Sequence, residues 1–600
     1  MTAIFGILGA ADRHELESMA HRLAHRGPWF EIWQPAPGVH LGVCHRSSGE
    51  RSSSTGLPLA LDGVIENGAE LVEAGACSAD AAKDDRLLID ELYRRDGLDA
   101  LGKLRGGFAL AIWDAPASRL VLAVDFFGMR SLLFAQAGER WVFASELKAL
   151  LAIADVASDV DPLMIRNANS KHSMNRYTSC IGGVRHVPPG QWVALSGDGM
   201  ASERFWQPDI AVVQRSDEEH VRDFRNTFLH VIKRKLAAHE RIGIAVSAGI
   251  DSAMVVGGIR HVAPDRILHT FCTGLGRDDP ELIGAAEIAH HYGTIHHEYI
   301  FDVDEIPDWL PIFAWHLEHP YGREDMIASY CTAVAASGHV DVLFGGYAAE
   351  NLVGGMPRHL LIYAAQRLPF LRPVIADLYQ YPRASIPPRT WLGRRLLEWY
   401  VKGTFPPPPV LGTPSLADED PMKVLPEMRW FKPTETDPFS RALLDSLLGT
   451  IENTEFDRLH QAAGVLVDSP FYDPDLIACS FRIPDHLKIK GVTQKYVQRA
   501  ALNEFLPPNM VKRPKTIITF RRDIKLADIL ETLARRVLSD RAVRERGLFD
   551  TQYVARALHR EAGQPYPKEQ FNRLWSIVLT EIWCRIFVDQ RGEFPAKPLW

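Results

Sequence analysis

The sequence lacks the features of several large classes of protein. No apolar run approaches the ~18 residues that cross a bilayer, and no basic flank precedes the apolar residues at the amino terminus, so neither a membrane protein nor a signal peptide is predicted. The seven cysteines are widely spaced and form no Cys-x-x-Cys pair. This spacing argues against a disulfide framework or a zinc site and suits a reducing cytoplasm. The net charge of −8 argues against nucleic acid as a partner.

What the sequence has is the composition of a large globular protein, with 46% hydrophobic and 24% charged residues. The first ~200 residues are rich in short apolar runs separated by turn residues, which favours packed sheets. The predicted strands are 4–8, 41–44, 108–113, 120–124 and 141–144, and the predicted helices are 12–23 and 81–95.

The pattern changes near residue 215. Ser216 and Glu219 form a capping-box pattern, and a helical period of apolar residues follows them. Strands and helices then alternate, which predicts a parallel sheet covered on both faces. The strands are 242–246, 267–273, 297–301 and 340–344, and the helices between them are 282–292 and 327–336. Residues from ~356 onward are mainly helical in pattern, and prolines 406–409 mark a linker or insertion.

The sharpest motif is Ser247-Ala248-Gly249-Ile250-Asp251-Ser252, between a predicted strand and a predicted helix. Small residues let backbone amides approach a phosphate, and the following helix N-terminus favours negative charge. Ser247, Gly249 and Ser252 are therefore candidate phosphate ligands. Asp251 would repel phosphates unless a cation lies between them, which predicts Mg²⁺. The alternative is an ordinary strand-to-helix turn.

Further motifs follow one another along most of the chain in the order found in asparagine synthetase B-type proteins, which the sequence resembles. The loop is similar to the Ser-Gly-Gly-x-Asp-Ser loop of ATP pyrophosphatases. The other pieces are residues 4–7, 25–28, 104–109, 113–114, 125–128, 143–148, 187–190, 470–473, 513–515, and Lys495 with Arg499.

The resemblance implies an α/β protein of two domains. Residues 1–210 would form a glutaminase-like domain, an Ntn-hydrolase-like αββα sandwich. Residues 211–600 would form an adenine-nucleotide α-hydrolase-like parallel-sheet domain with a helical C-terminal region, and an insertion at about 356–455.

Several positions of the glutaminase site depart from the family pattern. Thr2 stands where the family has its cysteine nucleophile, and a hydroxyl is a weaker nucleophile than a thiol near neutral pH. Asp62 replaces the asparagine of the oxyanion pair, and Trp29 replaces an aspartate, whereas Asp84 still matches the aspartate that binds the glutamine amine. We expect that glutamine hydrolysis is lost; catalysis by Thr2 is the alternative.

In the synthetase half, the family motif Gly-x-Gly-x-Asp-Glu-x-x-Gly-Gly aligns with residues 346–355. Gly346 then belongs to the ATP site, and Glu350 falls at the metal-binding aspartate and would share Mg²⁺ with Asp251. Tyr347 resembles the tyrosine of β-lactam synthetases, where a Tyr–Glu pair deprotonates the attacking amine; packing beside the sheet is the alternative. Lys515 matches the late catalytic lysine.

The resemblance therefore implies an ATP-dependent, AMP-forming ligase that adenylates a carboxylate and closes an intramolecular amide, as β-lactam synthetases do, in specialised metabolism. Its cofactors would be ATP and Mg²⁺, and its partner a small amino-acid-derived substrate or a ribosomal peptide. Lasso-peptide cyclisation, ammonia-dependent asparagine synthesis and a non-catalytic nucleotide-binding scaffold remain open, as does a homodimer.

Two histidine pairs, His290-His291 and His296-His297, have no acidic or cysteine partners at ligand spacing and are interpreted as structural.

Overall fold

A computed structural model gives the fold of the chain. It describes residues 2–46, 56–169, 179–208, 211–323, 325–368, 370, 373–374, 390–392, 410–413, 438–449, 452–507, 510, 524–561 and 563–595. Lys515 and most of the expected insertion at about 356–455 lie outside these residues. No described helix combines the length and the apolar character needed to cross a membrane.

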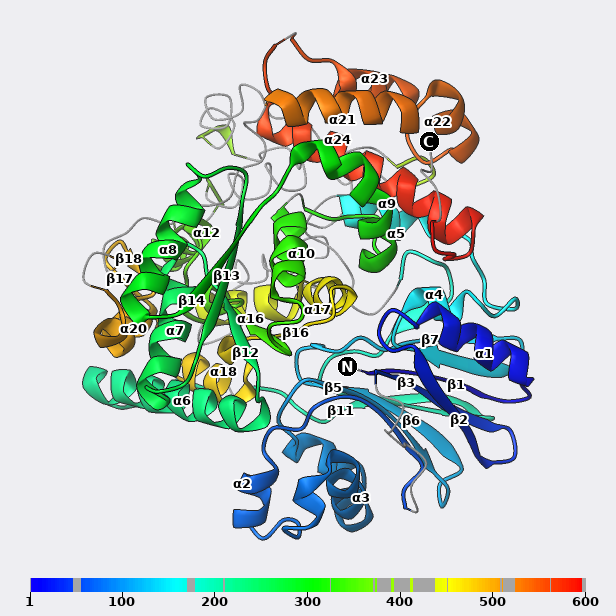
Figure 1. Cartoon of the computed structure of the whole chain (residues 1–600), viewed down its shortest axis with the longest axis horizontal. Coiled ribbons are helices and arrows are strands. Elements are labelled where there is room, and N and C mark those ends of the chain that lie inside the picture. Colours follow the sequence, from blue (N-terminus) through cyan, green and yellow to red (C-terminus); the bar gives the residue numbers. More distant parts are fainter. Residues whose placement is uncertain are drawn as a thin grey trace.

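The N-terminal part is built from two antiparallel sheets packed face to face (Figure 1). The apolar layer between them includes Ile4, Val124 and Phe143. One outer face is covered by α1 (Arg13–Arg22) and α4 (Leu147–Leu150), and the other by α3 (Asp85–Asp96). The predicted αββα sandwich is therefore confirmed.

The strand orders and bounds are as follows. The first sheet has the order β2-β3-β1-β8-β7-β9, with β1 Thr2–Leu8, β2 Trp29–Ala36, β3 Val39–His45, β7 Leu133–Ala137, β8 Arg140–Ala144 and β9 Val184–His186. The second has the order β11-β10-β6-β5-β4, with β4 Leu59–Gly63, β5 Phe108–Asp114, β6 Arg119–Val124, β10 Gln191–Ser196 and β11 Gly199–Arg204.

A second core surrounds a parallel sheet of order β14-β13-β12-β15-β16. Its strands are β12 Ile242–Ala245, β13 His269–Gly274, β14 Ile295–Ile300, β15 Val342–Phe344 and β16 Leu466–Asp468. Helix α10 (Asp325–Ala336) covers one face, where Thr332 hydrogen-bonds Thr273, and α8 (Pro280–Tyr292) covers the other, beside Cys272. The predicted parallel sheet is confirmed. Strand β16 was not predicted; its parallel pairing with β15, in which Val342 faces Leu466, places it at the edge of the sheet.

The remaining helices include α2 (Gly68–Glu73), α5 (Pro162–Asn169), α6 (Asp217–Ala238), α7 (Ile250–Val262), α9 (Ile306–Leu317), α11 (Ala349–Val353), α12 (Pro357–Arg367), α16 (Pro438–Gly449), α17 (Glu452–Ala462), α18 (Pro474–Phe481), α19 (Asp485–Lys488), α20 (Tyr496–Leu502), α21 (Ile524–Val537), α22 (Asp540–Arg546), α23 (Thr551–Leu558) and α24 (Lys568–Cys584). A short antiparallel pair joins β17 (Ile489–Lys490) to β18 (Thr493–Gln494).

Helix α6 begins where its capping pattern predicts, whereas α3 begins later than predicted. Ser216 and Glu219 form the predicted capping box of α6. The helix predicted at 81–95 is instead a 3₁₀ turn, Ala81–Lys83, followed by α3. Asp84 separates them, because its extended backbone (φ −136°) lets its carboxylate cap α3.

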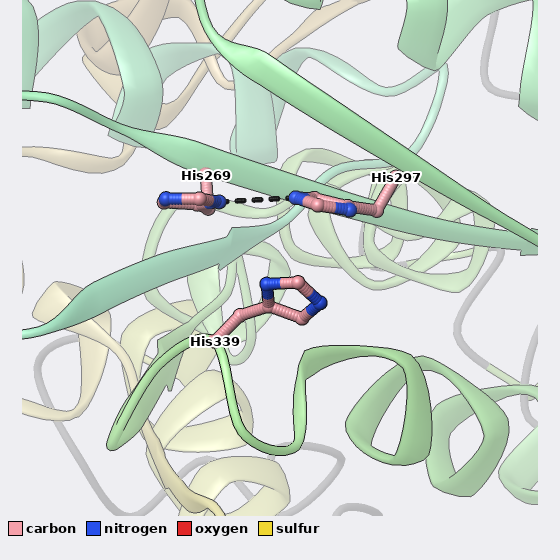
Figure 2. A group of neighbouring side chains, drawn as sticks. All are labelled: His269, His297 and His339. Atoms are coloured by element: carbon pink, nitrogen blue, oxygen red, sulfur yellow. Dashed lines mark hydrogen bonds between the residues drawn. The ribbon is translucent and has the colours of Figure 1, made fainter.

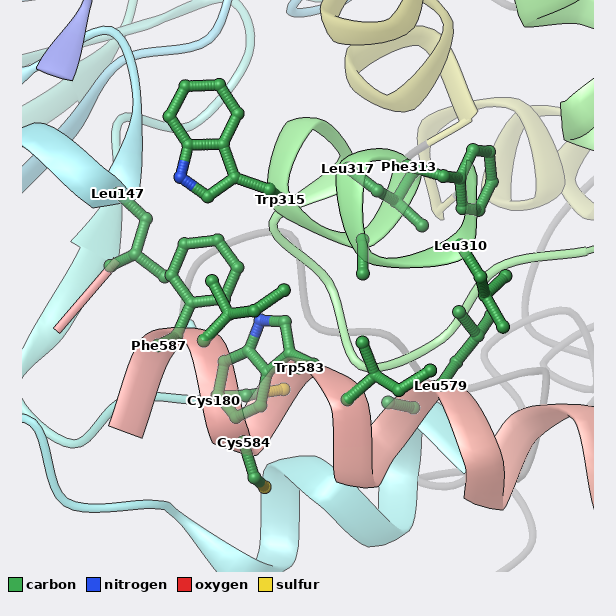
Figure 3. Packing of buried hydrophobic residues seen from close by; sticks show 14 of the residues in the cluster. Leu147, Cys180, Leu310, Phe313, Trp315, Leu317, Leu579, Trp583, Cys584 and Phe587 are labelled. Atoms are coloured by element: carbon green, nitrogen blue, oxygen red, sulfur yellow. The ribbon is translucent and has the colours of Figure 1, made fainter. Parts of the chain in front are cut away.

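The C-terminal helices pack against the N-terminal sandwich. Figure 3 shows Trp583 of α24 and Trp315 of α9 in one apolar cluster with Leu147 of α4. The indole N–H of Trp583 donates to the Glu318 carbonyl (3.0 Å), so this large ring is buried without an unpaired donor. Residues from both ends of the chain therefore share one core.

Candidate functional site

The loop from Ser247 to Ser252 connects the end of β12 to the start of α7, as predicted. The Ser252 hydroxyl accepts from the Ser247 N–H (3.1 Å), which closes the loop on itself. The Ala248 N–H donates to the buried Glu281 carboxylate of α8 (2.8 Å). Ala248, which replaces a family glycine, is outside the left-handed region, so its methyl group causes no backbone strain.

Gly346 follows β15 and lies directly against this loop. A Cβ atom at Gly346 would lie 2.6 Å from Cβ of Asp251 and 2.8 Å from the Ser252 nitrogen. Strands β12 and β15 are parallel neighbours, so the loops at their carboxyl ends meet at one edge of the sheet, where open α/β sheets bind ligands. The structure thus brings together the two motifs that the sequence placed about 95 residues apart.

Asp251 is held by two residues of the segment around α20. Lys495 Nζ lies 2.5 Å from one carboxylate oxygen, and Gln498 Nε2 donates to the other (3.0 Å). Lys495 has φ +57°, a conformation that a residue with a side chain adopts at a cost of about 1–2 kcal/mol. Lys495 belongs to a motif that matches the family but predicts no role for it, and no sequence motif identifies Gln498.

Glu350 lies at the start of α11 and belongs to the same neighbourhood. A Cβ atom at Gly355 would lie 2.1 Å from Cε of Lys495 and 3.0 Å from Cα of Glu350. Gly355 therefore lets the turn after α11 approach Lys495, which in turn contacts Asp251. Carboxylate oxygens are the donors that Mg²⁺ prefers, so Asp251 and Glu350 are the side chains of this neighbourhood that could hold a nucleotide-bound Mg²⁺. Both oxygens of Asp251 are bonded to Lys495 and Gln498 in this structure, so the ion would have to displace or share these partners.

Tyr347 packs beside the sheet with its ring 4.7 Å from that of Phe456 on α17. Burial raises the pKa of Tyr347 to about 12, and the Ser329 hydroxyl opposes that shift. Among the described residues no carboxylate contributes to this pKa, so the glutamate of a Tyr–Glu pair is not identified there. The catalytic role of Tyr347 stays a prediction. Lys515 lies outside the described residues, so its catalytic role stays a prediction as well.

Thr2 and Asp62 of the glutaminase-like site form one network with Arg26. The Thr2 hydroxyl donates to one oxygen of Asp62 (2.9 Å), and Arg26 donates to the other (2.6 Å). The side chains of Arg26 and Asp62 are 0% and 1% exposed. Asp84 stands apart, because its carboxylate caps α3 by accepting from the Arg86 N–H (2.8 Å).

The network continues into the second half of the chain. Arg26 Nε donates to Gln461 of α17 (3.0 Å), and the Gln461 amide donates to both oxygens of Asp457 (2.8 Å each). Asp457 also binds Arg130 of the N-terminal sandwich. No sequence motif identified Gln461 or Asp457, since neither position has a recognisable neighbour pattern.

A second cluster of acidic side chains surrounds a lysine of the same chain. Glu66, His239 and Asp468 place their ligand atoms within 4.8 Å of one another. Lys235 Nζ lies among them, 3.0 Å from Glu66 and 2.7 Å from Asp468. The ammonium group supplies the positive charge that a metal ion would otherwise bring.

Comparison with known proteins defines the class of the chain. The family model described as "Asparagine synthase" matches residues 223–585, and the model described as "Glutamine amidotransferase domain" matches residues 1–206. The chain belongs to the asparagine synthase family and is an ATP-dependent carbon–nitrogen ligase.

Particular relatives share most of its length. A Mycobacterium tuberculosis (strain H37Rv) protein named as an asparagine synthetase [glutamine-hydrolyzing] is 26% identical over 643 residues, covering 97% of this chain and 95% of its own. Asparagine synthetase [glutamine-hydrolyzing] 1 of Bacillus subtilis is 24% identical over 620 residues, with the same coverage. Among solved structures, a glutamine phosphoribosylpyrophosphate amidotransferase from B. subtilis is 14% identical and covers 51% of this chain and 92% of its own. The TM-score between the two structures is 0.27.

Proposed function

We propose that this ligase adenylates a carboxylate with ATP and closes an intramolecular amide, as β-lactam synthetases do, without hydrolysing glutamine. The observation that carries the proposal is the Thr2–Asp62–Arg26 network, in which Asp62 and Arg26 are buried. Glutamine hydrolysis needs donors that stabilise a developing oxyanion. A carboxylate 2.9 Å from the Thr2 hydroxyl places negative charge beside the atom that would attack. The ammonia source of glutamine-hydrolysing relatives is then missing, and in this proposal the amine comes from the substrate.

In the proposed reaction the substrate carboxylate attacks the α-phosphorus of ATP and releases pyrophosphate. Ser247, Gly249 and Ser252 hold the phosphates, with Gly346 supporting the loop. Asp251 and Glu350 hold Mg²⁺, which when bound offsets the phosphate charge. The substrate amine then attacks the acyl-adenylate and releases AMP, with Tyr347 assisting removal of its proton and Lys515 stabilising the charge that develops.

Tyr347 supports the β-lactam synthetase-like form of the proposal, because asparagine synthetases have glutamate at this position. Its ring is held by Phe456, so its place beside the loop does not depend on a ligand. The length of the 356–455 segment suits a larger substrate, so a peptide is the second substrate class.

The test measures AMP release from MgATP by the full chain with diamino acids, N-carboxyalkyl amino acids and linear peptides, each with and without ammonia or glutamine. The proposal expects substrate-dependent AMP release without ammonia and a product lighter than its substrate by one water. Release only with ammonia would instead support asparagine synthesis, and glutamate formed from glutamine would contradict the loss of the glutaminase.

The Tyr347→Phe variant separates adenylation from amide formation. Removal of the hydroxyl leaves the ring contact with Phe456 intact, so the fold should survive. We expect ATP–pyrophosphate exchange within about twofold of wild type and amide formation slowed at least about tenfold, a typical effect of losing one proton-transfer group. Equal loss of both steps would contradict the role of Tyr347 as the proton acceptor.

A further inference from the structure

Three histidines that are far apart in sequence meet at one end of the parallel sheet. His269 begins β13, His297 lies on β14, and His339 lies in the turn between α10 and β15. The strands are parallel, and the phosphate loop follows the carboxyl end of β12, so this amino end of β13 belongs to the opposite edge. The histidines are therefore separate from the nucleotide site.

Strand register places two of these rings on one face. Phe271 pairs with His297, and His269 is two residues before Phe271, so all three side chains project from the same side of the sheet. The His297 ring stacks on Phe271 (centroids 4.7 Å apart, 11° between planes) and lies 5.3 Å from that of His269. Both imidazoles are thus held against an aromatic ring rather than free in solvent.

The turn that ends α10 brings the third ring to them. The His339 N–H donates to the Ala336 carbonyl (3.1 Å), and Gly338 adopts φ +80°, which suits a helix C-terminus. The His339 ring is then 4.5 Å from the His297 ring. Backbone hydrogen bonds, and not the imidazole, fix the position of His339, so replacing this side chain should leave the turn in place.

The ring nitrogens converge. His269 Nδ1 and His297 Nε2 are 3.0 Å apart, and one nitrogen from each of the three rings lies within 4.8 Å of the others. Figure 2 shows the His339 ring beside the His269–His297 hydrogen bond, with a ring nitrogen turned toward it. Within the described part of the chain, the His339 ring makes no hydrogen bond.

We propose that His269, His297 and His339 bind one divalent ion of the Zn²⁺ type. Imidazole nitrogens bind Zn²⁺ at 2.0–2.1 Å, so two of them on one tetrahedral ion lie about 3.3 Å apart. The observed 3.0 Å pair needs only a small separation to reach this spacing. Three nitrogen ligands leave a fourth position for water or an anion on the exposed His339 side.

The surroundings favour the form of histidine that a metal needs. Burial lowers the pKa of His269, with His339 adding to the effect, and burial together with the neighbouring histidines lowers the pKa of His297. Neutral imidazoles are the ligands of Zn²⁺, and the shifts at His269 and His297 act toward that form. Because the ligands come from β13, β14 and the α10–β15 turn, the bound ion would connect the edge strand of the sheet to the helix that covers it.

The experiment titrates tag-free, chelator-treated full-length protein with Zn²⁺ in the absence of ATP, by competition with a chromophoric chelator. We expect one equivalent to bind tightly, and we expect His339→Ala to weaken that binding at least about 100-fold, since one of three ligands is lost. His291→Ala is the matched control, because His291 is exposed on the last turn of α8 and lies outside the cluster. X-ray absorption of the bound zinc should show imidazole scattering.

Thermal unfolding supplies a second readout. Zn²⁺ at 100 times its Kd should raise the unfolding midpoint of wild type and of the His291→Ala control, but not that of His339→Ala. Wild-type affinity in His339→Ala would overturn the proposal, and so would the absence of stoichiometric zinc in the wild type. An adenylation defect would not affect either result, because neither measurement uses ATP.

Discussion

Three non-glycine residues near functional or connecting positions adopt left-handed backbone: Glu318 (φ +60°), Ala348 (φ +66°) and Lys495 (φ +57°). Two of them gain contacts from it: Lys495 reaches Asp251, and the Glu318 carboxylate accepts from the Leu147 and Lys148 N–H groups (2.8 and 2.9 Å). The Ala348 side chain is only a methyl group and makes no polar contact, although its carbonyl accepts from the Asn351 N–H (2.9 Å). Ala348 stands where the family motif has glycine, so no side-chain contact compensates for its strained backbone.

Ala348→Gly is therefore expected to raise the free energy of unfolding by about 1 kcal/mol, because glycine adopts positive φ without the clash of a Cβ atom. The unfolding midpoint in denaturant measures the change. Ala349→Gly is the control: Ala349 begins α11 and is fully buried, so glycine there should lower stability. A lower midpoint for Ala348→Gly would contradict the assignment of strain.

Gly346→Ala tests the contact between the two ATP-site loops. The new methyl group would lie 2.6 Å from Cβ of Asp251 and 2.8 Å from a backbone nitrogen, so the phosphate loop must shift. We expect at least a tenfold loss of MgATP affinity by calorimetry, since loop shifts of this size misplace the phosphate donors. Gly276→Ala, where a methyl group meets nothing within 4 Å, should bind MgATP like wild type. Unchanged affinity in Gly346→Ala would show that ATP binds elsewhere.

At the scale of elements, the sequence predicted what periodicity and local chemistry determine. The capping box of α6 and the alternation around β12 to β15 were readable because each is set by neighbours in the chain. The 3₁₀ break at Asp84 was not predicted although its cap is local, because the helical period runs through it. Strand β16 was not predicted because pairing with the distant β15 places it. In the same way Lys495 and Gln498 reach Asp251 from nearly 250 residues away, and the histidine cluster depends on strand register.

Helix α3 offers a pH test at its first residue. Burial raises the pKa of Asp85 to about 6, with Asp84 and Glu66 adding to the shift and the Ile65 N–H opposing it. Below about pH 4 the carboxyl group is protonated in both the folded and the unfolded state. Between pH 4 and 6 the folded state keeps a proton that the unfolded state has lost, so stability falls as pH rises.

Asp85→Asn should therefore match wild type near pH 4 and exceed it at pH 7 by about 1 kcal/mol, a value reduced from the full shift because Asp85 is partly exposed. Unfolding midpoints at pH 4, 5, 6 and 7 measure the difference between the two proteins. The exposed Asp80→Asn variant should show no such trend. A difference that is independent of pH would contradict the assignment of the raised pKa to Asp85.

At the scale of the whole molecule, buried ion pairs connect the N-terminal sandwich to the rest of the chain. Arg130 binds Asp457, Lys235 binds Glu66, and Lys148 binds Glu318. A buried ion pair adds little net stability, because desolvation offsets the attraction, but removing one partner is costly. Such pairs therefore favour one relative placement of the two halves. This gives the glutaminase-like domain a structural role that does not require its chemistry.

Asp457→Asn tests this role, because it leaves the Arg130 guanidinium, 4% exposed, without its charge partner. We expect a loss of about 3 kcal/mol or more, seen as a lower calorimetric unfolding midpoint or as separate transitions for the two halves. Asp341→Asn is the control: its pair with Arg241 is about half exposed and should cost less than about 1 kcal/mol. Equal shifts in the two variants would contradict the structural role. Because Phe456, which holds the Tyr347 ring, precedes Asp457 on α17, amide formation should fall with stability in Asp457→Asn and stay at the wild-type rate in the control.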